Sequence, residues 1–595
     1  MPGLADASLQ KTRRFPLYVT PDLGYSGIMR TILTTLHSKF IHNSLALPCL
    51  AAYCGDACGE LLIREFTVHE PRESILSLLL AEAPDVIAFS VYIWNRRATL
   101  DLVDALAVAR PELNIVLGGP EVSFDDDELF ARHPGLTALI RGEGEEPLRS
   151  LLLAWHQQQQ PGAIPRTVLR KETELISGPD SPPLADLDCI PSPFQAGLID
   201  LERGFVYYET SRGCPFHCSF CLSARDTHMR SYSMARIYSD LLFLMQHKIP
   251  KVKLVDRTFN FDASRAREIF RFILEHNQST HFHFEIAAHL LDEATLKLLD
   301  TVPENTFQFE IGVQSTLEST LDTIGRKVNL TKLEENVRHL RKSGRINLHL
   351  DLVAGLPGDD YNSFLASIDR VAALVPHHLQ IEPVKLLPGS PLRDQAAALQ
   401  IRHDPNPPYT VLASRELSFA ELQQLQEISR LIDLTYNSGC FQAFLKELCA
   451  ATGSLATGLA WLAREWRKRD LFRFPLSRQA IFEHLFDIIQ EREKDLSHVR
   501  LVEGLACDYA RCERIVTNRI PVFFDTGLTS AEQQWVHNTV QDKTAEIKGM
   551  GIKLQYFATI FTTMHSSAQR TVYLFCYLTA AGQKMRVEEY HYNND

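Results

Sequence analysis

The sequence predicts an α/β fold followed by a mainly helical C-terminal region, and three observations support this prediction. Strand-like apolar runs alternate with helix-like segments over residues 28–152, a pattern typical of a parallel, doubly wound sheet. Six further strand-like segments follow between residues 205 and 386, each pair separated by a plausible helix, as in a partial (β/α)6 barrel. From about residue 415 the apolar spacing becomes helical, and strand-like runs return near 553–563 and 570–578.

The individual elements follow from these patterns. In the first region the expected strands are 28–36, 61–68, 85–94, 114–120 and the start of 138–152, with helices at 43–56, 73–82 and 96–109. In the second region the expected strands are 205–211, 251–256, 282–288, 307–313, 347–355 and 378–386. Residues 155–200 are rich in Gln and Pro, which predicts a linker. The predicted division is an N-terminal extension (1–28), a first domain (29–154), a linker (155–200), a barrel (201–400) and a C-terminal domain (415–595).

Composition and charge restrict the possible partners. The 595 residues include 61 basic and 73 acidic side chains, a net charge of −12, which makes nucleic acid an unlikely ligand. No stretch approaches the length of a membrane span, and the N-terminus lacks the apolar core of a signal peptide. We therefore expect a cytoplasmic protein with no membrane partner.

Three of the twelve cysteines, Cys214, Cys218 and Cys221, lie within eight residues directly after the first expected barrel strand. A structural zinc site needs four ligands, which His217 or His228 could complete. A ferredoxin-type cluster has two-residue gaps and a fourth cysteine, and this loop has neither feature. Three thiolates on a four-iron cluster leave one iron without a protein ligand, so the spacing favours a reactive [4Fe-4S] cluster.

The loop CPFHCSFC, with Phe220 before its third cysteine, resembles the signature of the radical S-adenosylmethionine (radical SAM) enzymes. The resemblance implies that Cys214, Cys218 and Cys221 are catalytic cluster ligands. It also implies that S-adenosylmethionine binds the open iron and is cleaved to a 5′-deoxyadenosyl radical.

Polar residues at the ends of the later barrel strands are candidates for the same site. By the same resemblance, Glu310 and Gln314 are assigned to S-adenosylmethionine, and Glu285 is a further cofactor-binding candidate. The remaining strand-end candidates are Asp256, Arg257, Asn260, Gly312, Asp351, Gly355 and Gly358.

The first domain should bind a ligand at the carboxyl ends of its strands. Its four loops there contain neither GxGxxG nor a P-loop, so a dinucleotide or nucleoside triphosphate is not indicated. Together with the cysteine loop, this region resembles the Rossmann-like cobalamin-binding domain of one class of radical SAM enzymes. That resemblance implies cobalamin contacts from Ser38, Ser90, Tyr92, Trp94, Asn95, Gly118, Gly119, Pro120, Glu121, Gly142, Glu143 and Gly144.

The histidine that ligates cobalt in many cobalamin proteins belongs to the motif Asp-x-His-x-x-Gly, which this domain lacks. The nearest match, DTHMRS at 226–231, lacks the Gly and lies in the barrel. We therefore expect cobalamin bound without its own base and without a protein histidine, with His37 and His42 as polar loop residues.

Resemblance to this class covers residues 29–395, and the whole chain resembles a subfamily with a C-terminal domain of unknown function. It implies a cobalamin-dependent methyltransferase that acts on an unactivated carbon of a small molecule or peptide through the deoxyadenosyl radical and methylcobalamin. Two alternatives stay open: a non-methylating rearrangement or cyclisation, and a non-enzymatic cobalamin or redox sensor. An electron donor such as flavodoxin or ferredoxin is implied, and residues 415–595 are a candidate substrate lid.

Overall fold

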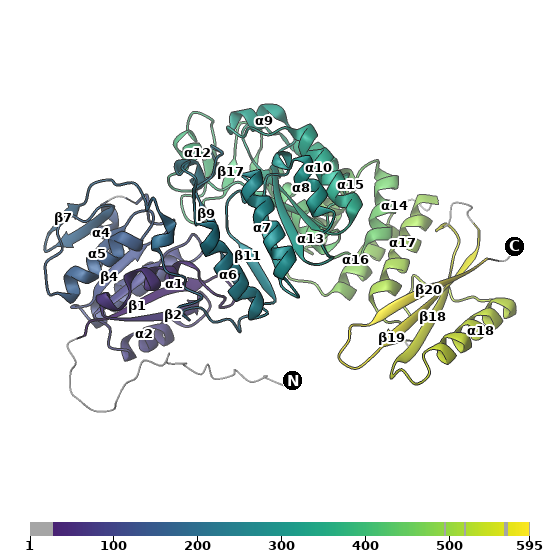
Figure 1. Ribbon diagram of the computed structural model, residues 1–595. Coiled ribbons are helices and arrows are strands. Elements are labelled where there is room, and N and C mark those ends of the chain that lie inside the picture. The colour runs from purple at the N-terminus through teal and green to yellow at the C-terminus, as the bar shows by residue number, and fades with distance from the viewer. Residues whose placement is uncertain (1–27, 126, 493–495, 517–518, 565–568, 594–595) are drawn as a thin grey trace.

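The computed structural model describes residues 28–593 apart from 126, 493–495, 517–518 and 565–568. The expected N-terminal extension therefore lies outside the described residues, except for its last position. The chain forms three parts in a row, with the first domain at one end, the barrel in the middle and the C-terminal region at the other end (Figure 1).

The first domain is a seven-stranded sheet in the order β2-β1-β3-β4-β5-β6-β7, in which the first five strands are parallel. Those strands are β1 (Arg30–His37), β2 (Glu60–Thr67), β3 (Val86–Ser90), β4 (Asn114–Gly118) and β5 (Ala138–Ile140). The helices are α1 (Ala46–Cys54), α2 (Arg72–Ala81), α3 (Arg96–Ala109), α4 (Glu128–Arg132) and α5 (Glu145–His156). Apolar side chains of α1 and α5 pack on one face of the sheet and those of α2, α3 and α4 on the other, which confirms the doubly wound fold.

The expected linker contains part of this sheet. Strands β6 (Thr167–Lys171) and β7 (Glu174–Ser177) form a hairpin that pairs antiparallel with β5, with Ala138 opposite Leu169. Both strands are short and are flanked by Pro-rich sequence, so local composition hides a pairing made with a distant strand.

The second domain is a partial barrel of six parallel strands in the order β15-β14-β13-β12-β11-β8, and all six expected strands are confirmed. They are β8 (Phe205–Tyr208), β11 (Lys251–Leu254), β12 (His281–Ile286), β13 (Phe307–Gln314), β14 (Asn347–Ala354) and β15 (His378–Pro383). The covering helices are α6 (Met234–Gln246), α7 (Ala263–His276), α8 (Glu293–Leu299), α9 (Glu318–Thr323), α10 (Leu330–Ser343) and α11 (Tyr361–Ala372). Alternation along each strand buries residues such as Phe284 and Phe309 beneath the helices and turns polar residues to the inner face.

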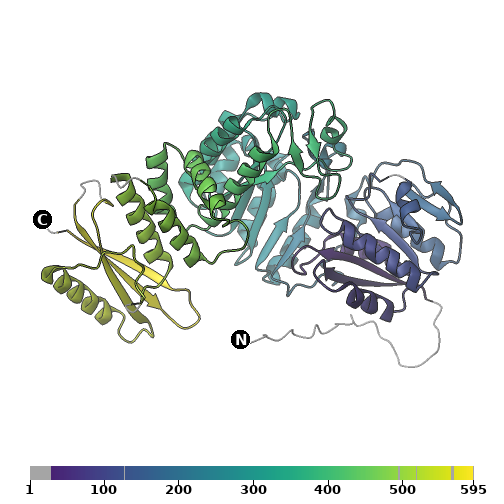
Figure 2. The same ribbon diagram turned by 180° about the vertical axis from the view of Figure 1, so that it is seen from behind.

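The C-terminal region is helical and ends in a three-stranded antiparallel sheet, β18-β19-β20. Its helices are α13 (Phe419–Leu434), α14 (Gln442–Thr452), α15 (Leu455–Lys468), α16 (Arg478–Gln490), α17 (Leu496–Cys512) and α18 (Ser530–Glu546). The two expected strands are confirmed as β18 (Lys553–Phe561) and β19 (Thr571–Thr579), and β20 (Arg586–Asn593) was not anticipated. Figures 1 and 2 place this sheet at the end of the molecule away from the first domain.

The C-terminal region is joined closely to the barrel. Helix α13 lies along the edge strand β15, where the Ser429 hydroxyl donates to the carbonyl oxygen of Ile381 at 2.9 Å. The Asn437 side chain accepts from the Leu379 amide and donates to the Leu379 carbonyl, each at 2.9 Å. One apolar core runs without interruption from the barrel strands through α13 to α17.

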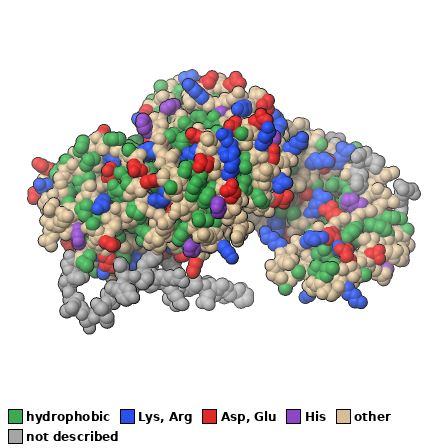
Figure 3. Space-filling model, in the orientation of Figure 1, with side chains coloured by type: hydrophobic (Ala, Val, Ile, Leu, Met, Phe, Trp, Pro, Cys, Tyr) green, Lys and Arg blue, Asp and Glu red, His purple; other side chains and the backbone are tan. Residues whose placement is uncertain are grey.

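On the face that is drawn in Figure 3, no large region of the surface carries charge of a single sign. Among the described residues, no helix combines the length and the apolar composition that crossing a membrane requires. Figure 3 shows basic and acidic side chains interspersed over the barrel.

Candidate active site

The three cysteines lie on a loop closed by a short antiparallel pair, β9 (Ser211–Arg212) and β10 (Arg230–Ser231). Gly213 opens the loop with a φ of +93°, and a Cβ there would lie 2.4 Å from the His228 carbonyl oxygen. Only glycine fits that backbone position. The Cys214 amide then donates to the Asp226 carbonyl at 3.1 Å, which ties the two ends of the loop together.

All three cysteines line one cavity of about 210 Å³ at the carboxyl ends of the barrel strands, together with Phe220. Cys214 and Cys218 are buried and Cys221 is partly exposed. Among the described residues, no three His, Cys, Asp or Glu side chains converge closely enough to hold a single metal ion. Thiols that surround a cavity fit a multi-iron cluster better than a single ion, and His217 and His228 are exposed and do not line this cavity.

Arg326 is a cavity residue that the sequence analysis missed. It follows α9, and its guanidinium donates to the Cys218 sulfur at 3.4 Å and also to the Gly312 carbonyl oxygen. Burial raises the pKa of the Cys218 thiol, and the positive charge of Arg326 opposes that rise. This arginine is therefore placed to stabilise negative charge on the thiolates.

Three expected carboxylates, Glu285, Glu310 and Asp351, line the same cavity. Burial raises the pKa of Glu285 to about 7. Burial, reinforced by Glu310 and Glu285, raises the pKa of Asp351 to about 8. The pKa of Glu310 lies below its usual value because His283 stands 3.1 Å from its carboxylate. Near neutral pH the Asp351 carboxyl is thus largely protonated and that of Glu285 is about half protonated.

This protonation gives a testable dependence of stability on pH. Between about pH 4 and pH 8 the unfolded chain releases the Asp351 proton while the folded chain keeps it, so stability falls as pH rises. We expect Asp351→Asn to raise the thermal unfolding midpoint at about pH 8 and to flatten its decline from pH 5. Asp322→Asn, on the exposed surface, is the control and should keep the parental slope. Equal slopes in the two variants would contradict a protonated Asp351.

Gln314, an expected S-adenosylmethionine contact, lies at a break in the strand register. Its φ is +71°, and the pairing of β13 with β14 shifts between Gly312 and Gln314. A Cβ at Gly312 would lie 2.1 Å from the Nε2 atom of the Gln314 side chain. The bulge therefore turns this side chain into the cavity, and such strain clusters at ligand sites.

Two other strand-end candidates have structural partners. Asp256 is buried and accepts hydrogen bonds from Thr210 and Ser211, which fixes the strand that leads into the cysteine loop. The buried Asn260 amide exchanges two hydrogen bonds with the Ala287 backbone. Arg257, which lies between them in the sequence, lines the cavity.

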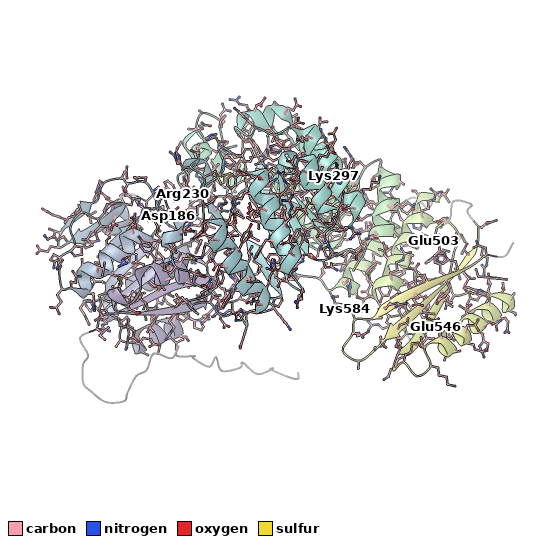
Figure 4. All side chains as sticks on the ribbon, viewed as in Figure 1. Asp186, Arg230, Lys297, Glu503, Glu546 and Lys584 are labelled. Atoms are coloured by element: carbon pink, nitrogen blue, oxygen red, sulfur yellow. The ribbon has the colours of Figure 1, made fainter. Side chains whose placement is uncertain are left out.

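A buried ion-pair network joins the first domain to the cysteine loop. Arg212 pairs with Glu143 at 3.0 Å and Glu145 at 2.8 Å, and with Glu209 at 2.7 Å. Arg230 pairs with the same Glu143 at 2.6 Å, and Figure 4 places Arg230 at the junction of the two domains. Burial acts to raise the pKa of Glu143, but the two arginines outweigh it and hold that pKa below its usual value. Glu143, expected to contact a cofactor, thus already connects the two domains.

Two of the expected cobalamin residues after β3 form a stacked aromatic pair, on a loop that is held in place by hydrogen bonds. The Tyr92 and Trp94 rings stack with centroids 4.6 Å apart, and Trp94 is 47% exposed. The buried Asn95 side chain accepts from the Tyr92 amide and donates to the Leu36 carbonyl. Asn95 therefore holds the loop, while Trp94 offers an aromatic surface at the carboxyl edge of the sheet.

Several other expected cobalamin residues shape their loops. Gly119 has a φ of +105°, and a Cβ there would lie 2.6 Å from the Val91 carbonyl oxygen. Glu121 is buried, and its carboxylate accepts from the Tyr409 hydroxyl. The rest lie at the carboxyl ends of β1, β3, β4 and β5, as expected: Ser38, Ser90, Gly118, Pro120, Gly142 and Gly144.

The two histidines expected in loops lie at the boundary between the domains, but the loop prediction is wrong for His37, which is the last residue of β1. His37 is buried with its Nε2 atom 3.1 Å from Glu65, which also pairs with Arg203. His42 is half-buried with its ring against Phe205. Burial lowers the pKa of His42.

Three family models match the chain in the order of these parts. A B12 binding domain matches residues 32–152, the Radical SAM superfamily matches 208–371, and a protein of unknown function (DUF4080) matches 399–570.

Curated relatives resemble the first two parts. The cobalamin-dependent radical SAM methyltransferase TokK of Streptomyces tokunonensis is 28% identical over 332 residues, which cover 52% of this chain and 48% of TokK. The 2-(S-pantetheinyl)-carbapenam-3-carboxylate methyltransferase of Streptantibioticus cattleyicolor is 27% identical over 333 residues, again 52% of this chain and 48% of the relative. The chain thus spans about half the length of these relatives.

A solved structure shares the fold over most of the chain. The cobalamin-dependent S-adenosylmethionine radical enzyme OxsB matches with a TM-score of 0.57 and 16% identity, over 88% of this chain and 81% of OxsB. The cysteine loop, the six-stranded barrel and the doubly wound sheet before it agree with these matches. The chain therefore contains, in order, a B12-binding domain, a radical SAM domain and a DUF4080 region.

Proposed function

We propose that the protein is a cobalamin-dependent radical SAM methyltransferase that acts on an unactivated carbon of a small molecule or peptide. The observation that carries this proposal is the cavity shared by three cysteines and the strand-end residues Glu285, Glu310 and Gln314. The B12-binding domain that contacts the same loop, and the methyltransferases that match half of the chain, add support.

The residues present fit the cofactors that this function needs. Cys214, Cys218 and Cys221 would hold a [4Fe-4S] cluster, and Glu285, Glu310 and Gln314 would bind S-adenosylmethionine beside it. The exposed Trp94 ring, which stacks on the partly buried Tyr92, would contact cobalamin. Bound together, these groups supply one-electron, hydrogen-abstraction and methyl-transfer chemistry.

The chain's own residues orient and protect the reactants. The positive charge of Arg326 lies beside Cys218 and would lower the free-energy cost of burying an anionic cluster. Phe216, Phe220 and Ile286 line the cavity with apolar surface and limit the access of water. Electrons would come from a small donor such as flavodoxin or ferredoxin.

The function is tested by anaerobic reconstitution with iron, sulfide, cobalamin and methyl-labelled S-adenosylmethionine. Metabolite extracts of cells grown with and without the protein serve as substrate. We expect a labelled product together with 5′-deoxyadenosine. Labelled S-adenosylmethionine consumed to 5′-deoxyadenosine without labelled product would favour a non-methylating reaction, and no turnover at all would favour a sensor.

We also predict that cobalamin binds without a histidine ligand. The Nε2 atom of His37 is engaged by Glu65, and the His42 ring is packed at the barrel. His37→Ala and His42→Ala should therefore leave the base-off absorption spectrum unchanged. An imidazole-ligated cobalt signal in electron paramagnetic resonance, lost in either variant, would overturn this prediction.

The C-terminal region stays a candidate lid over the substrate. Because β18 to β20 lie at the end away from the B12-binding domain, a lid role falls to its first helices, beginning with α13. The segments between β15 and α13 lie nearer to the first domain, as the contact of Tyr409 with Glu121 shows.

A further inference from the structure

A second cavity, of about 590 Å³, lies between the first domain and the segments that follow the last barrel strand. Arg96, Phe124 and Arg132 form its wall in the first domain. The opposite wall comes from two segments after the last barrel strand: Pro388, Gly389, Arg393 and Asp394 in the first, and Pro405, Asn406, Pro407 and Tyr409 in the second. Its size is that of a small-molecule site.

The two walls contact each other directly. The Tyr409 hydroxyl donates to the buried Glu121 carboxylate, and within the first domain Arg96 donates to the Glu121 carbonyl at 3.0 Å. The Phe124 ring lies against Gly389, where a Cβ would come within 2.4 Å of the ring. The cavity is thus formed in advance by the packing of the domains.

The charge balance of the lining leaves two arginines available. Asp125 is paired with Arg96 at 2.8 Å, and Asp394 is paired with Arg225 at 2.9 Å. Within the described chain, neither Arg132 nor Arg393 has a carboxylate within 4.0 Å.

Arg393 in particular is oriented by neutral groups. It donates to the Leu386 carbonyl at 2.8 Å and lies 4.8 Å from the Tyr409 ring centroid. Since a guanidinium carries five N–H donors, most of its donors remain available to a ligand.

The cavity adjoins the cluster site through one short element. Ser223 and Ala224 line the cysteine cavity, and the next residue, Arg225, donates to the Gly389 carbonyl at 2.7 Å and to Asp394. Gly389 and Asp394 both line the second cavity. A molecule anchored there lies next to the loop that carries Cys221.

We propose that this cavity binds the anionic group of the substrate, a phosphate or a carboxylate, on Arg132 and Arg393. Arginine recognises both anions through paired, charge-assisted hydrogen bonds. Anchoring one end of a small molecule here leaves its other end to reach the cluster cavity. The identity of the ligand as substrate rests on the proposed methyl transfer, but the anion site itself does not.

The test is calorimetric titration of the anaerobically purified full-length protein with inorganic pyrophosphate and, separately, with succinate. We expect saturable binding of at least one probe, weakened by about tenfold in Arg393→Gln and in Arg132→Gln. Arg97→Gln, an exposed arginine outside the cavity, is the matched control and should bind as the parent does. Melting curves check that each variant is folded. If Arg393→Gln is unfolded, the test rests on Arg132→Gln, because Arg132 is exposed.

Repeating the titration after saturation with hydroxocobalamin separates the two sources of anion. Unchanged pyrophosphate binding supports a substrate site, whereas loss of binding assigns the cavity to the phosphate of the cofactor and overturns the proposal. Absence of saturable binding, or equal affinity in the parent and both arginine variants, also overturns it. None of these outcomes depends on the labelled-product assay, so failure here is distinct from failure of the proposed function.

Discussion

Replacing any one of Cys214, Cys218 and Cys221 with Ala is expected to reduce the iron bound after anaerobic reconstitution from about four per chain to near zero. Formation of 5′-deoxyadenosine should fall to the background of the cluster-free protein. The reason is that these are the only cysteines lining the cavity, so the described site offers no spare thiolate. Iron analysis, visible absorption and product chromatography measure the effect.

Cys189→Ala is the matched control for this experiment. Cys189 is exposed and lies outside the cavity, with its thiol donating to the Asp186 carbonyl. It should keep the iron content and activity of the parent. Retention of about four irons by all three cavity variants would disprove the cluster assignment.

The second large effect is expected for Arg212→Ala, at the contact between the B12-binding domain and the cysteine loop. Burial acts against the charge of Arg212, but Glu209 and Glu145 outweigh it and raise its pKa. Removing the guanidinium leaves Glu143, Glu145 and Glu209 without this partner, at 19%, 5% and 15% side-chain exposure. Loss of one partner from such a network costs on the order of 3–5 kcal/mol.

We expect two readouts to change together in Arg212→Ala. The urea concentration at the unfolding midpoint should fall, and the cluster should be lost faster to an iron chelator, because Arg212 directly precedes the loop that holds the cysteines. Arg97→Ala, exposed and outside the network, should change neither. If the midpoint fell while the chelation rate stayed at the parental value, the network would be structural without supporting the loop.

The sequence predicts most of the fold because its strands and helices carry their pattern locally. Helix α3 begins and ends where the periodicity over 96–109 predicts. Strand β3 ends at Ser90, four residues before the end of its apolar run, because the Asn95 side chain folds residues 91–94 back onto β1. That contact joins residues far apart in the chain, and composition does not record it.

In the candidate site, too, the sequence reveals residues with a local pattern and misses those that depend on contacts between distant residues. The cysteines were found because their spacing is itself the signal. Arg326 was missed because it lies more than a hundred residues after Cys218 and reaches the sulfur only when α9 packs beside the loop. Glu121 and Glu143 were expected at a cofactor, but their carboxylates are bonded to Tyr409 and to Arg212 and Arg230, all from the barrel side of the junction. Interdomain pairing and ligand binding draw on the same polar residues at loop ends, and sequence alone does not separate them.

The packing of α13 along β15 determines which fragments of this protein can be isolated. Because β15 is the terminal strand of its sheet, cutting the chain before α13 would uncover a row of unpaired backbone groups. It would also expose the apolar residues by which α13 and α15 join the barrel core. Such a fragment should self-associate, so its inactivity would reveal nothing about catalysis. The barrel and the DUF4080 region should unfold as one cooperative unit, and substitutions on the surface of that region are the informative way to study it.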